Sequence, residues 1–378
     1  MWDWNFVIKL LIFCFLMYAD KMICKYRDKN RYECISIRKK KIILFRWKFE
    51  IKRRCYWDSK TNQYVYLLDE WLGIKKHQHI PTKEIENMCK MVINKMTFNQ
   101  VSFCYGNCIP LNTVYRSIKN QSITYIVDFK INPKNYKNIY INIDDTYRNF
   151  RVDNKKQKCK EKVIHFHQGT EEGKFINEIN AVIFNKIGLD SKQSMASTID
   201  IIKSILFTNY GDPSQFNIIV CGDGARYIDT IAHALHAKNV LDSYHAVHNI
   251  DFTFNTKKLK NFNPNCVGLI DERFIKNSLK ETITILVKQG KPVKAYKLLI
   301  AVMQKYHHYY HKLNRLVYYL RNHKKSIEMW NDPAYVGTAT ETHVQQYVKS
   351  YFGNVGRCYS LESFMNILKA RCLVYFIK

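Results

Sequence analysis

The sequence predicts an α/β protein in which a mixed sheet flanked by helices follows a basic β segment and a group of short helices. From residue 138 onward, apolar residues alternate or cluster in runs of strand length, separated by stretches of helical spacing. The expected elements are, in order, strands 138–144, 146–153 and 161–169, helices 172–186 and 194–209, strand 216–222, helix 225–235 and strand 237–242. Three strands in a row, then strand–helix–strand, is the order of a ribonuclease H-like domain. Residues 246–335 break this alternation and predict a helical insertion.

The whole chain is expected to divide into four parts. These are an apolar helix at 1–20, a basic β-rich segment at 21–80, a helix-turn-helix at 81–122 and the ribonuclease H-like domain at 123–378. The helix-turn-helix depends on three short helical patterns with a glycine-containing break before the last, which many helical bundles also show. The apolar stretch 5–20 is short for a membrane span, which needs about 20 residues. We therefore expect a buried helix there rather than a membrane segment.

Composition points to a polyanionic partner. The chain has 60 Lys and Arg against 32 Asp and Glu, a formal net charge of +28. The excess is concentrated in residues 20–60, with 15 Lys and Arg against 5 Asp and Glu. Such clustering favours nucleic acid or an anionic membrane surface, although an AT-rich genome also raises the lysine content. The 12 cysteines are scattered, which is typical of reduced intracellular thiols rather than a disulfide framework.

Candidate DNA contacts lie in two places. The basic β segment carries Arg53 and Arg54, and an ordinary solvated sheet face is an equally good interpretation of it. The last helix of the predicted helix-turn-helix would present the following side chains to a DNA groove: Asn112, Thr113, Arg116 and Lys119.

Three carboxylates are candidates for a metal site. Asp144 ends the first strand, Asp223 follows the strand "NIIVCG", and Glu341 stands in "GTATETHVQQYV" at a helix start. Three carboxylates brought together by a sheet suit a pair of magnesium ions, which together bind the attacking and leaving oxygens of a phosphoryl transfer. Each residue alone also has a structural interpretation, and Asp145 competes with Asp144 for the first position. We favour Asp144 because the alternation of the isoleucines before it places it on the polar face.

Glycines and histidines complete the set of candidates. Gly222 and Gly224 flank Asp223, where they permit a sharp strand-to-helix turn and close approach of a ligand. His307 and His311 have the helical spacing of a metal-ligand pair, and we interpret them as DNA-facing or packing residues. The other histidines with a pattern, in "HFH" at 165–167, are expected to frame the sheet. No phosphate-binding loop or dinucleotide fingerprint occurs, so no nucleotide cofactor is expected.

The sequence resembles a known family at several of these places. "GDGARYI" followed by "NVLDSYHAVHNI" resembles the second catalytic block of bacterial DDE transposases of the ISL type. That family was long catalogued as an uncharacterised protein family; it is related to the Mutator-like transposases and includes transposase-like proteins of integrative conjugative elements. "FEIKRRCYWDSKTNQYVYLLDEWLGI" is similar to its basic N-terminal block, "INIDDTYRNFR" to its first-aspartate block and "ETHVQQYVKSYF" to its glutamate block.

The resemblance implies a DNA transposase that cuts and joins mobile-element ends. Asp144, Asp223 and Glu341 would be ligands of Mg²⁺, for which Mn²⁺ can substitute, and His245 would match an Asp-x-x-His motif with Asp242. The implied partner is double-stranded DNA, both element ends and target, bound by a homo-oligomer in the cytoplasm at the nucleoid. The family's glutamate is usually followed by glycine, whereas Thr342 stands here, and the chain looks short at both ends. The alternatives are a catalytically inactive, transposase-derived DNA-binding protein and a membrane-anchored basic protein.

Overall fold

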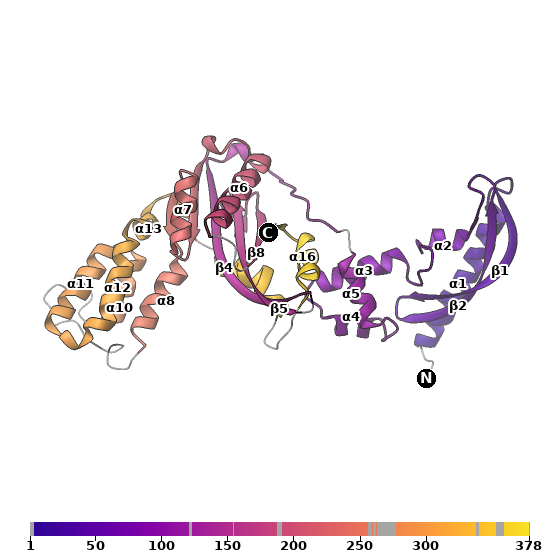
Figure 1. Cartoon of the computed structure of the whole chain (residues 1–378), viewed down its shortest axis with the longest axis horizontal. Helices are drawn as coiled ribbons and strands as arrows, with labels where there is room; N and C mark the ends of the chain where they lie inside the picture. The colour runs from indigo at the N-terminus through magenta and orange to yellow at the C-terminus, as the bar shows by residue number, and fades with distance from the viewer. Residues whose placement is uncertain are drawn as a thin grey trace. The chain divides into compact units, whose positions relative to one another are not determined.

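The protein is described by a computed structural model covering residues 4–120, 123–153, 155–186, 191–255, 259, 262, 277–337, 340–352 and 359–377. The chain divides into two compact units (Figure 1). Unit 1 comprises Met1–Thr124 and Ser360–Arg371, and unit 2 comprises Tyr125–Tyr359 and Cys372–Lys378. It is a mixed α/β protein whose largest sheet has six strands.

A three-stranded antiparallel sheet and one long helix begin unit 1. The strands are β1 (Tyr32–Leu44), β2 (Trp47–Asp58) and β3 (Gln63–Val65), in the order β1-β2-β3. Helix α1 (Trp4–Tyr26) packs Leu16 against an apolar cluster that includes Phe49 and Ile51 of β2. The expectation of a buried helix holds for this face only, because α1 also carries these exposed side chains: Trp4, Phe6, Leu11 and Phe15. No helix in the described part of the chain combines the length and apolar character needed to cross a membrane.

Short helices make up the rest of unit 1. They are α2 (Leu67–Trp71), α3 (Thr82–Ile93), α4 (Phe98–Cys104), α5 (Leu111–Lys119) and α16 (Leu361–Lys369). Thr97 caps α4, since its hydroxyl accepts a hydrogen bond from the Gln100 amide while the Gln100 side chain accepts one from the Thr97 amide. Helix α5 buries Val114 and Ile118 and packs on α3, α4 and α16.

Unit 2 is built on the six-stranded sheet, with the order β10-β9-β4-β5-β8-β11. The strands are β4 (Asn138–Val152), β5 (Lys155–His167), β8 (Ile179–Lys186), β9 (Asn217–Gly222), β10 (Lys238–Leu241) and β11 (Leu373–Ile377), and a small hairpin of β6 (Thr170–Glu171) and β7 (Lys174–Phe175) lies between β5 and β8. Strand β5 runs antiparallel to both neighbours, whereas β9, β10 and β11 pair in parallel. The sheet is therefore mixed, as predicted.

Two sequence predictions about this sheet were wrong, and one strand was missed. Residues 138–153 form one strand instead of two, because β4 pairs with β5 without interruption from Tyr140 to Val152. The expected helix at 172–186 is the β7 end of the hairpin followed by β8. The C-terminal strand β11 was not expected. Asp144 consequently lies inside β4, at the point where pairing with β9 stops after Ile143.

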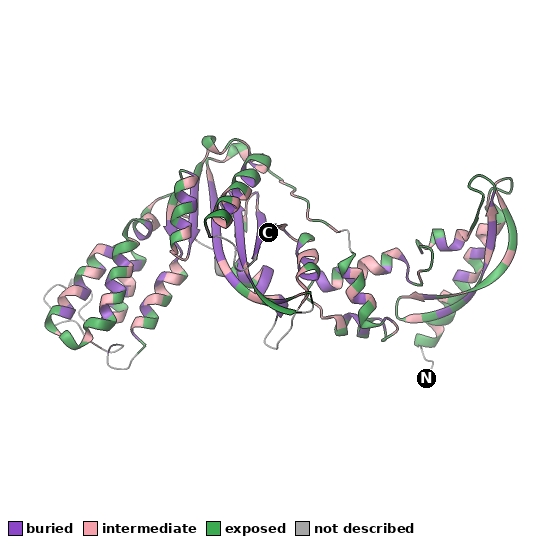
Figure 2. Ribbon diagram, in the orientation of Figure 1, coloured by how far each residue is buried: buried purple, intermediate pink, exposed green. Residues whose placement is uncertain are grey.

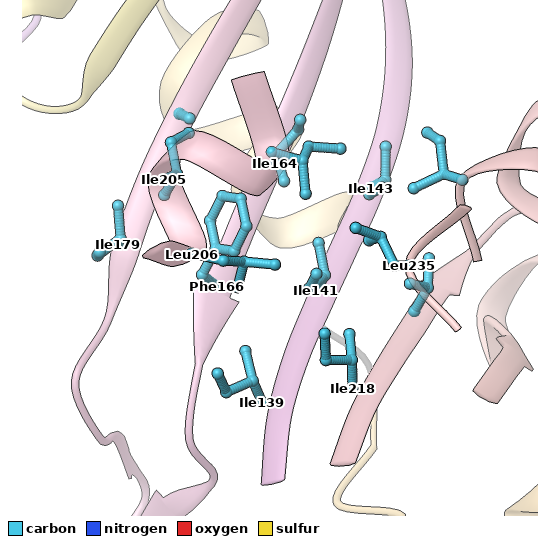
Figure 3. Close-up of a cluster of buried hydrophobic side chains, with 14 of the residues drawn as sticks. Ile139, Ile141, Ile143, Ile164, Phe166, Ile179, Ile205, Leu206, Ile218 and Leu235 are labelled. Carbon is cyan, nitrogen blue, oxygen red and sulfur yellow. The ribbon is translucent and has the colours of Figure 1, made fainter. Parts of the chain in front are cut away.

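One face of the sheet packs against α6 (Ser191–Asn209) and α7 (Arg226–Ala234). Figure 3 shows this core, in which Ile139, Ile141 and Ile143 of β4 lie among side chains of β5, β8, β9 and the helices. Figure 2 shows the strands largely buried, whereas α6 and α7 expose their outer sides. Tyr140, Asn142 and Asp144 alternate with the isoleucines and thus belong to the other face.

The predicted insertion is helical where it is described. Its helices are α8 (Ser243–Thr253), α10 (Leu279–Lys288), α11 (Pro292–Lys305), α12 (Tyr310–Asn322) and α13 (Lys324–Glu328), which share a second apolar core. After it, α14 (Thr340–Val344) packs on β4 and β5, and a π-helical turn (Gln345–Lys349) and α15 (Ser350–Phe352) follow.

Candidate functional site

Three aspartates lie where the parallel pairing of β4, β9 and β10 ends. Ile143 of β4 and Leu241 of β10 both pair with Gly222 of β9. The residue that follows each of these three in the sequence is an aspartate: Asp144, Asp223 and Asp242. Parallel pairing in register therefore brings these three residues to one edge of the sheet, where open α/β sheets bind ligands.

Asp144 and Asp145 have different surroundings. Asp145 accepts hydrogen bonds from the ammonium groups of Lys162, at 2.6 Å, and Lys160, at 2.7 Å. Lys162 also lies 3.6 Å from the ring centre of Tyr227, on α7. Asp145 therefore forms ion pairs with two lysines on the side of the sheet that α7 covers. The side chain of Asp144, 7% exposed, accepts the Asp145 amide at 2.8 Å on the other face.

His245 lies among the carboxylates at this edge. Its Nδ1 is 3.0 Å from Oδ2 of Asp242, which also caps α8 by accepting the Tyr244 amide at 3.1 Å. The Asp242 hydrogen bond raises the pKa of His245, and the negative charges of Asp144 and Asp223 raise it further. The predicted Asp-x-x-His pair is therefore brought next to the two strand-end aspartates.

Gly222 and Gly224, beside Asp223, are packed so closely against other side chains that neither position has room for a Cβ. A Cβ on Gly222 would lie 2.7 Å from Cδ1 of Ile228, and one on Gly224 would lie 2.8 Å from Cε1 of His323. Gly224 also has a φ of +85°, which favours glycine. These positions allow the turn from β9 into α7 and the close packing of the insertion, rather than open approach of a ligand.

Glu341 is the one predicted ligand whose side chain lies outside the described residues. Its backbone belongs to α14, which packs on β4 and β5. Among described residues, the three strand-end aspartates are not gathered as a group with ligand atoms within 4.8 Å of one another.

A different group does meet that distance: His165 of β5, Glu178 before β8 and His343 of α14. The interpretation of His165 as a frame for the sheet is therefore incomplete. The His165 ring stacks on His343, with centres 3.6 Å apart, and on His167, at 4.9 Å. Sequence reasoning missed Glu178 and His343, and the alternation in "HFH" was the only signal near them.

These groups have strongly shifted pKa values. Burial lowers the pKa of His343 and of His167 to about 3, and it also lowers that of His165. Burial acts to raise the pKa of Glu178, but hydrogen bonds with His165 and Asn180 outweigh it and bring the pKa to about 2. The cluster thus combines neutral imidazoles with an ionised carboxylate.

The predicted arginine contacts in unit 1 are engaged inside the protein. Arg53 is 6% exposed, its Nε lies 2.9 Å from Asp69, and its guanidinium lies 3.4 Å from the ring centre of Tyr66. Arg54 forms an ion pair with the buried Asp20 of α1. Both arginines therefore stabilise the packing of unit 1, and their contact with DNA stays a prediction.

Other cations of unit 1 are exposed. Cross-strand pairing puts an exposed cationic face on the β1-β2 hairpin, formed by Lys39, Lys41, Lys48 and Lys52 around Glu50. Helix α5 exposes Asn112, Arg116 and Lys119, as predicted, while Thr113 is half-buried and Lys119 lies 3.0 Å from Glu362.

Comparison with known proteins gives one assignment. A search of curated proteins found no match. The sequence profile of an uncharacterised protein family, UPF0236, matches residues 5–315, which include Asp144, Asp223 and His245. Because this match covers most of the chain, the protein belongs to the uncharacterised protein family UPF0236.

Proposed function

We propose that this protein is a DDE-type DNA transposase, which cuts the ends of a mobile DNA element and joins them to target DNA. The observation that carries the proposal is the convergence of Asp144, Asp223 and the Asp242–His245 pair at one edge of the sheet. The order β8-β5-β4-β9-β10 supports a ribonuclease H-like core, because β4 is central and the two parallel strands follow on its other side.

The carboxylates at this edge of the sheet are suitable ligands for Mg²⁺. Aspartate oxygens are the ligands that Mg²⁺ prefers, and the two lysines that hold Asp145 leave Asp144 as the aspartate of β4 on the ligand side. Asp144, Asp223 and Glu341 would hold two Mg²⁺ ions, with Mn²⁺ as a substitute. When bound, the two ions would activate water for cleavage and then the freed 3′-hydroxyl for joining.

The protein's own groups bind and orient the DNA. His245, whose pKa is raised by Asp242 and its neighbours, donates a hydrogen bond to a phosphate oxygen beside the scissile bond. The exposed lysines of the β1-β2 hairpin contact phosphates, and α5 of the α3-α4-α5 group enters a groove as in a helix-turn-helix. Two element ends must be joined, so we expect a homo-oligomer acting in the cytoplasm at the nucleoid.

A strand-transfer assay tests the enzyme. Labelled duplexes made from the DNA on either side of the gene are incubated with Mg²⁺ or Mn²⁺ and either wild type, Asp223→Asn or the exposed control Asp200→Asn. We expect metal-dependent joining in wild type and control and a loss of at least about 100-fold in Asp223→Asn. Specific binding without nicking in all three proteins would instead identify an inactive, transposase-derived DNA-binding protein.

A salt titration tests the cationic hairpin separately. Each lysine that contacts a phosphate contributes about −0.9 to the slope of log K against log salt concentration. Lys48→Ala/Lys52→Ala should therefore flatten the slope by about 2, whereas the exposed control Lys203→Ala/Lys288→Ala should leave it unchanged. An unchanged slope in the hairpin variant would place the DNA elsewhere.

A further inference from the structure

Three side chains from separate segments of unit 2 form a compact group on the sheet face opposite α6 and α7. His165 belongs to β5, Glu178 to the segment before β8 and His343 to α14. Each offers one ligand atom, and these atoms all lie within 4.8 Å of one another. Nε2 of His165 lies 3.5 Å from Oε1 of Glu178.

The group contains buried polar atoms that lack partners. His343 is 4% exposed, and neither of its ring nitrogens has a hydrogen-bond partner in the described structure. Nε2 of the fully buried His165 has Oε1 of Glu178 as its neighbour, at 3.5 Å, which is longer than an ordinary hydrogen bond. A neutral imidazole has one donor and one acceptor nitrogen, and leaving either unsatisfied in the interior is costly. A cation bound to a ring nitrogen removes that cost.

We propose that His165, Glu178 and His343 bind a divalent first-row transition metal ion, with Zn²⁺ as the best fit. Two imidazole nitrogens and one carboxylate are a ligand set found in zinc sites, whereas Mg²⁺ takes oxygen ligands. Ligand atoms around a tetrahedral Zn²⁺ lie about 3.3 Å apart, given Zn–N bonds of about 2.0–2.1 Å. The 3.5 Å between His165 and Glu178 already meets this spacing, and the separations to His343, which are no more than 4.8 Å, would have to shorten by side-chain rotation when the ion binds.

Neighbouring hydrogen bonds orient the ligands. The Gly169 amide donates to Nδ1 of His167 at 3.1 Å, which leaves the hydrogen of that imidazole on Nε2. Nε2 lies 3.2 Å from Nδ2 of Asn142, and a donor at Nε2 needs an oxygen there, so this assignment exchanges the nitrogen and oxygen of the Asn142 amide. The same oxygen then accepts from Nδ1 of His165, also at 3.2 Å, and the lone pair on Nε2 of His165 points to the ion.

A second assignment of the hydrogens on His167 and His165 needs no metal ion. If Nδ1 of His167 donates to the Gly169 carbonyl, at 3.2 Å, the tautomers reverse and Nε2 of His165 donates to Glu178. That assignment leaves both nitrogens of His343 unsatisfied, which is why we favour the metal. The bound ion would join α14 to β5.

Metal binding to the purified full-length chain tests the proposal. The chain is stripped with a chelator, desalted and titrated with Zn²⁺ or Co²⁺. We expect about one equivalent bound by elemental analysis, visible absorption bands from Co²⁺, and a melting temperature raised by roughly 5–10 °C at a Zn²⁺ concentration 100-fold above Kd. A chain that binds no ion overturns the proposal and supports the metal-free assignment.

Variants locate the ion. Glu178→Gln and His343→Asn should both lose the Co²⁺ bands. If His343→Asn does not fold, the result for Glu178→Gln alone tests the proposal. The matched control His307→Asn/His311→Asn, in the exposed histidine pair, should retain them. Retention in Glu178→Gln, or loss in the control, would overturn the assignment. Asp144→Asn/Asp223→Asn should also retain the bands, so the outcome is independent of the proposed transposase activity.

Discussion

Glu161 is a buried carboxylic acid, and its replacement by glutamine should stabilise unit 2 at neutral pH. The side chain is 0% exposed on β5, and neither carboxylate oxygen has a hydrogen-bond partner in the described structure. Burial raises its pKa to about 8, and attraction by Arg148 offsets this only in part. Glutamine has nearly the same shape and no charge, so Glu161→Gln removes the ionisation equilibrium while conserving the packing.

The sign and size of the effect follow from the two pKa values. The ordinary pKa of glutamate is 4.5, and burial raises the pKa of Glu161 in the folded protein to about 8. Between these values the unfolded chain has released the proton that the folded chain keeps, so stability falls by about 1.4 kcal/mol for each pH unit of increase. The penalty is about 3 kcal/mol at pH 7 and close to zero at pH 4. Glu161→Gln should be more stable than wild type by that amount at pH 7 and by almost nothing at pH 4.

Hydrogen–deuterium exchange of peptides from β5 measures this difference in unit 2 alone. After correction for the intrinsic exchange rate, β5 in Glu161→Gln should open roughly 100-fold less often than in wild type at pH 7, and equally often at pH 4. Glu171→Gln, at an exposed position of β6, is the matched control and should behave as wild type. Equal exchange in Glu161→Gln and wild type at pH 7, or a difference independent of pH, would refute the reasoning.

The remaining predictions concern the edge of the sheet that carries the aspartates. Asp145→Asn removes the partner of two largely buried lysines and should lower the free energy of unfolding by about 3 kcal/mol in chemical denaturation, whereas Asp144→Asn should cost less than about 1 kcal/mol. Equal losses would contradict the division of roles between the two residues. Gly224→Ala places a methyl group 2.8 Å from His323 at a φ of +85° and should cost about 2 kcal/mol in thermal denaturation. Gly211→Ala, at a φ of +101° with open space around it, should cost about 1 kcal/mol, and an equal loss there would exclude packing as the cause.

Strands in which apolar and polar residues alternate clearly were predictable from the sequence. The isoleucines of "NIYINID" alternate, and they do form one side of the core. Residues 172–186 were mispredicted because β8 is apolar on both faces: Ile179, Ala181 and Ile183 join the main core, while Val182 and Phe184 are buried as well. A continuous apolar run of this kind fits a helix as well as a buried strand when only the sequence is considered.

Residues of the candidate site were predictable only where the pattern within a single strand or turn identifies them. Alternation along β4 chose Asp144 over Asp145, and the ion pairs of Asp145 with lysines of β5 agree with that choice. The metal-binding group could not be found in the same way. His165, Glu178 and His343 come from three segments, and only the packing of α14 on β5 brings them together.

The two glycines beside Asp223 explain how this edge of the sheet is built. Gly222 occupies a position where a Cβ would press against Ile228 and the carbonyl oxygen of Ile143, so its absence lets α7 pack directly onto the end of β9. Gly224 then turns the chain through a left-handed conformation under His323 of the insertion. Asp223 is held between these two packing constraints, and its Oδ1 accepts the amide of Ala225 at 2.8 Å. A larger residue at either glycine would therefore displace the carboxylate itself, which makes both glycines positioning residues for any ligand that Asp223 binds.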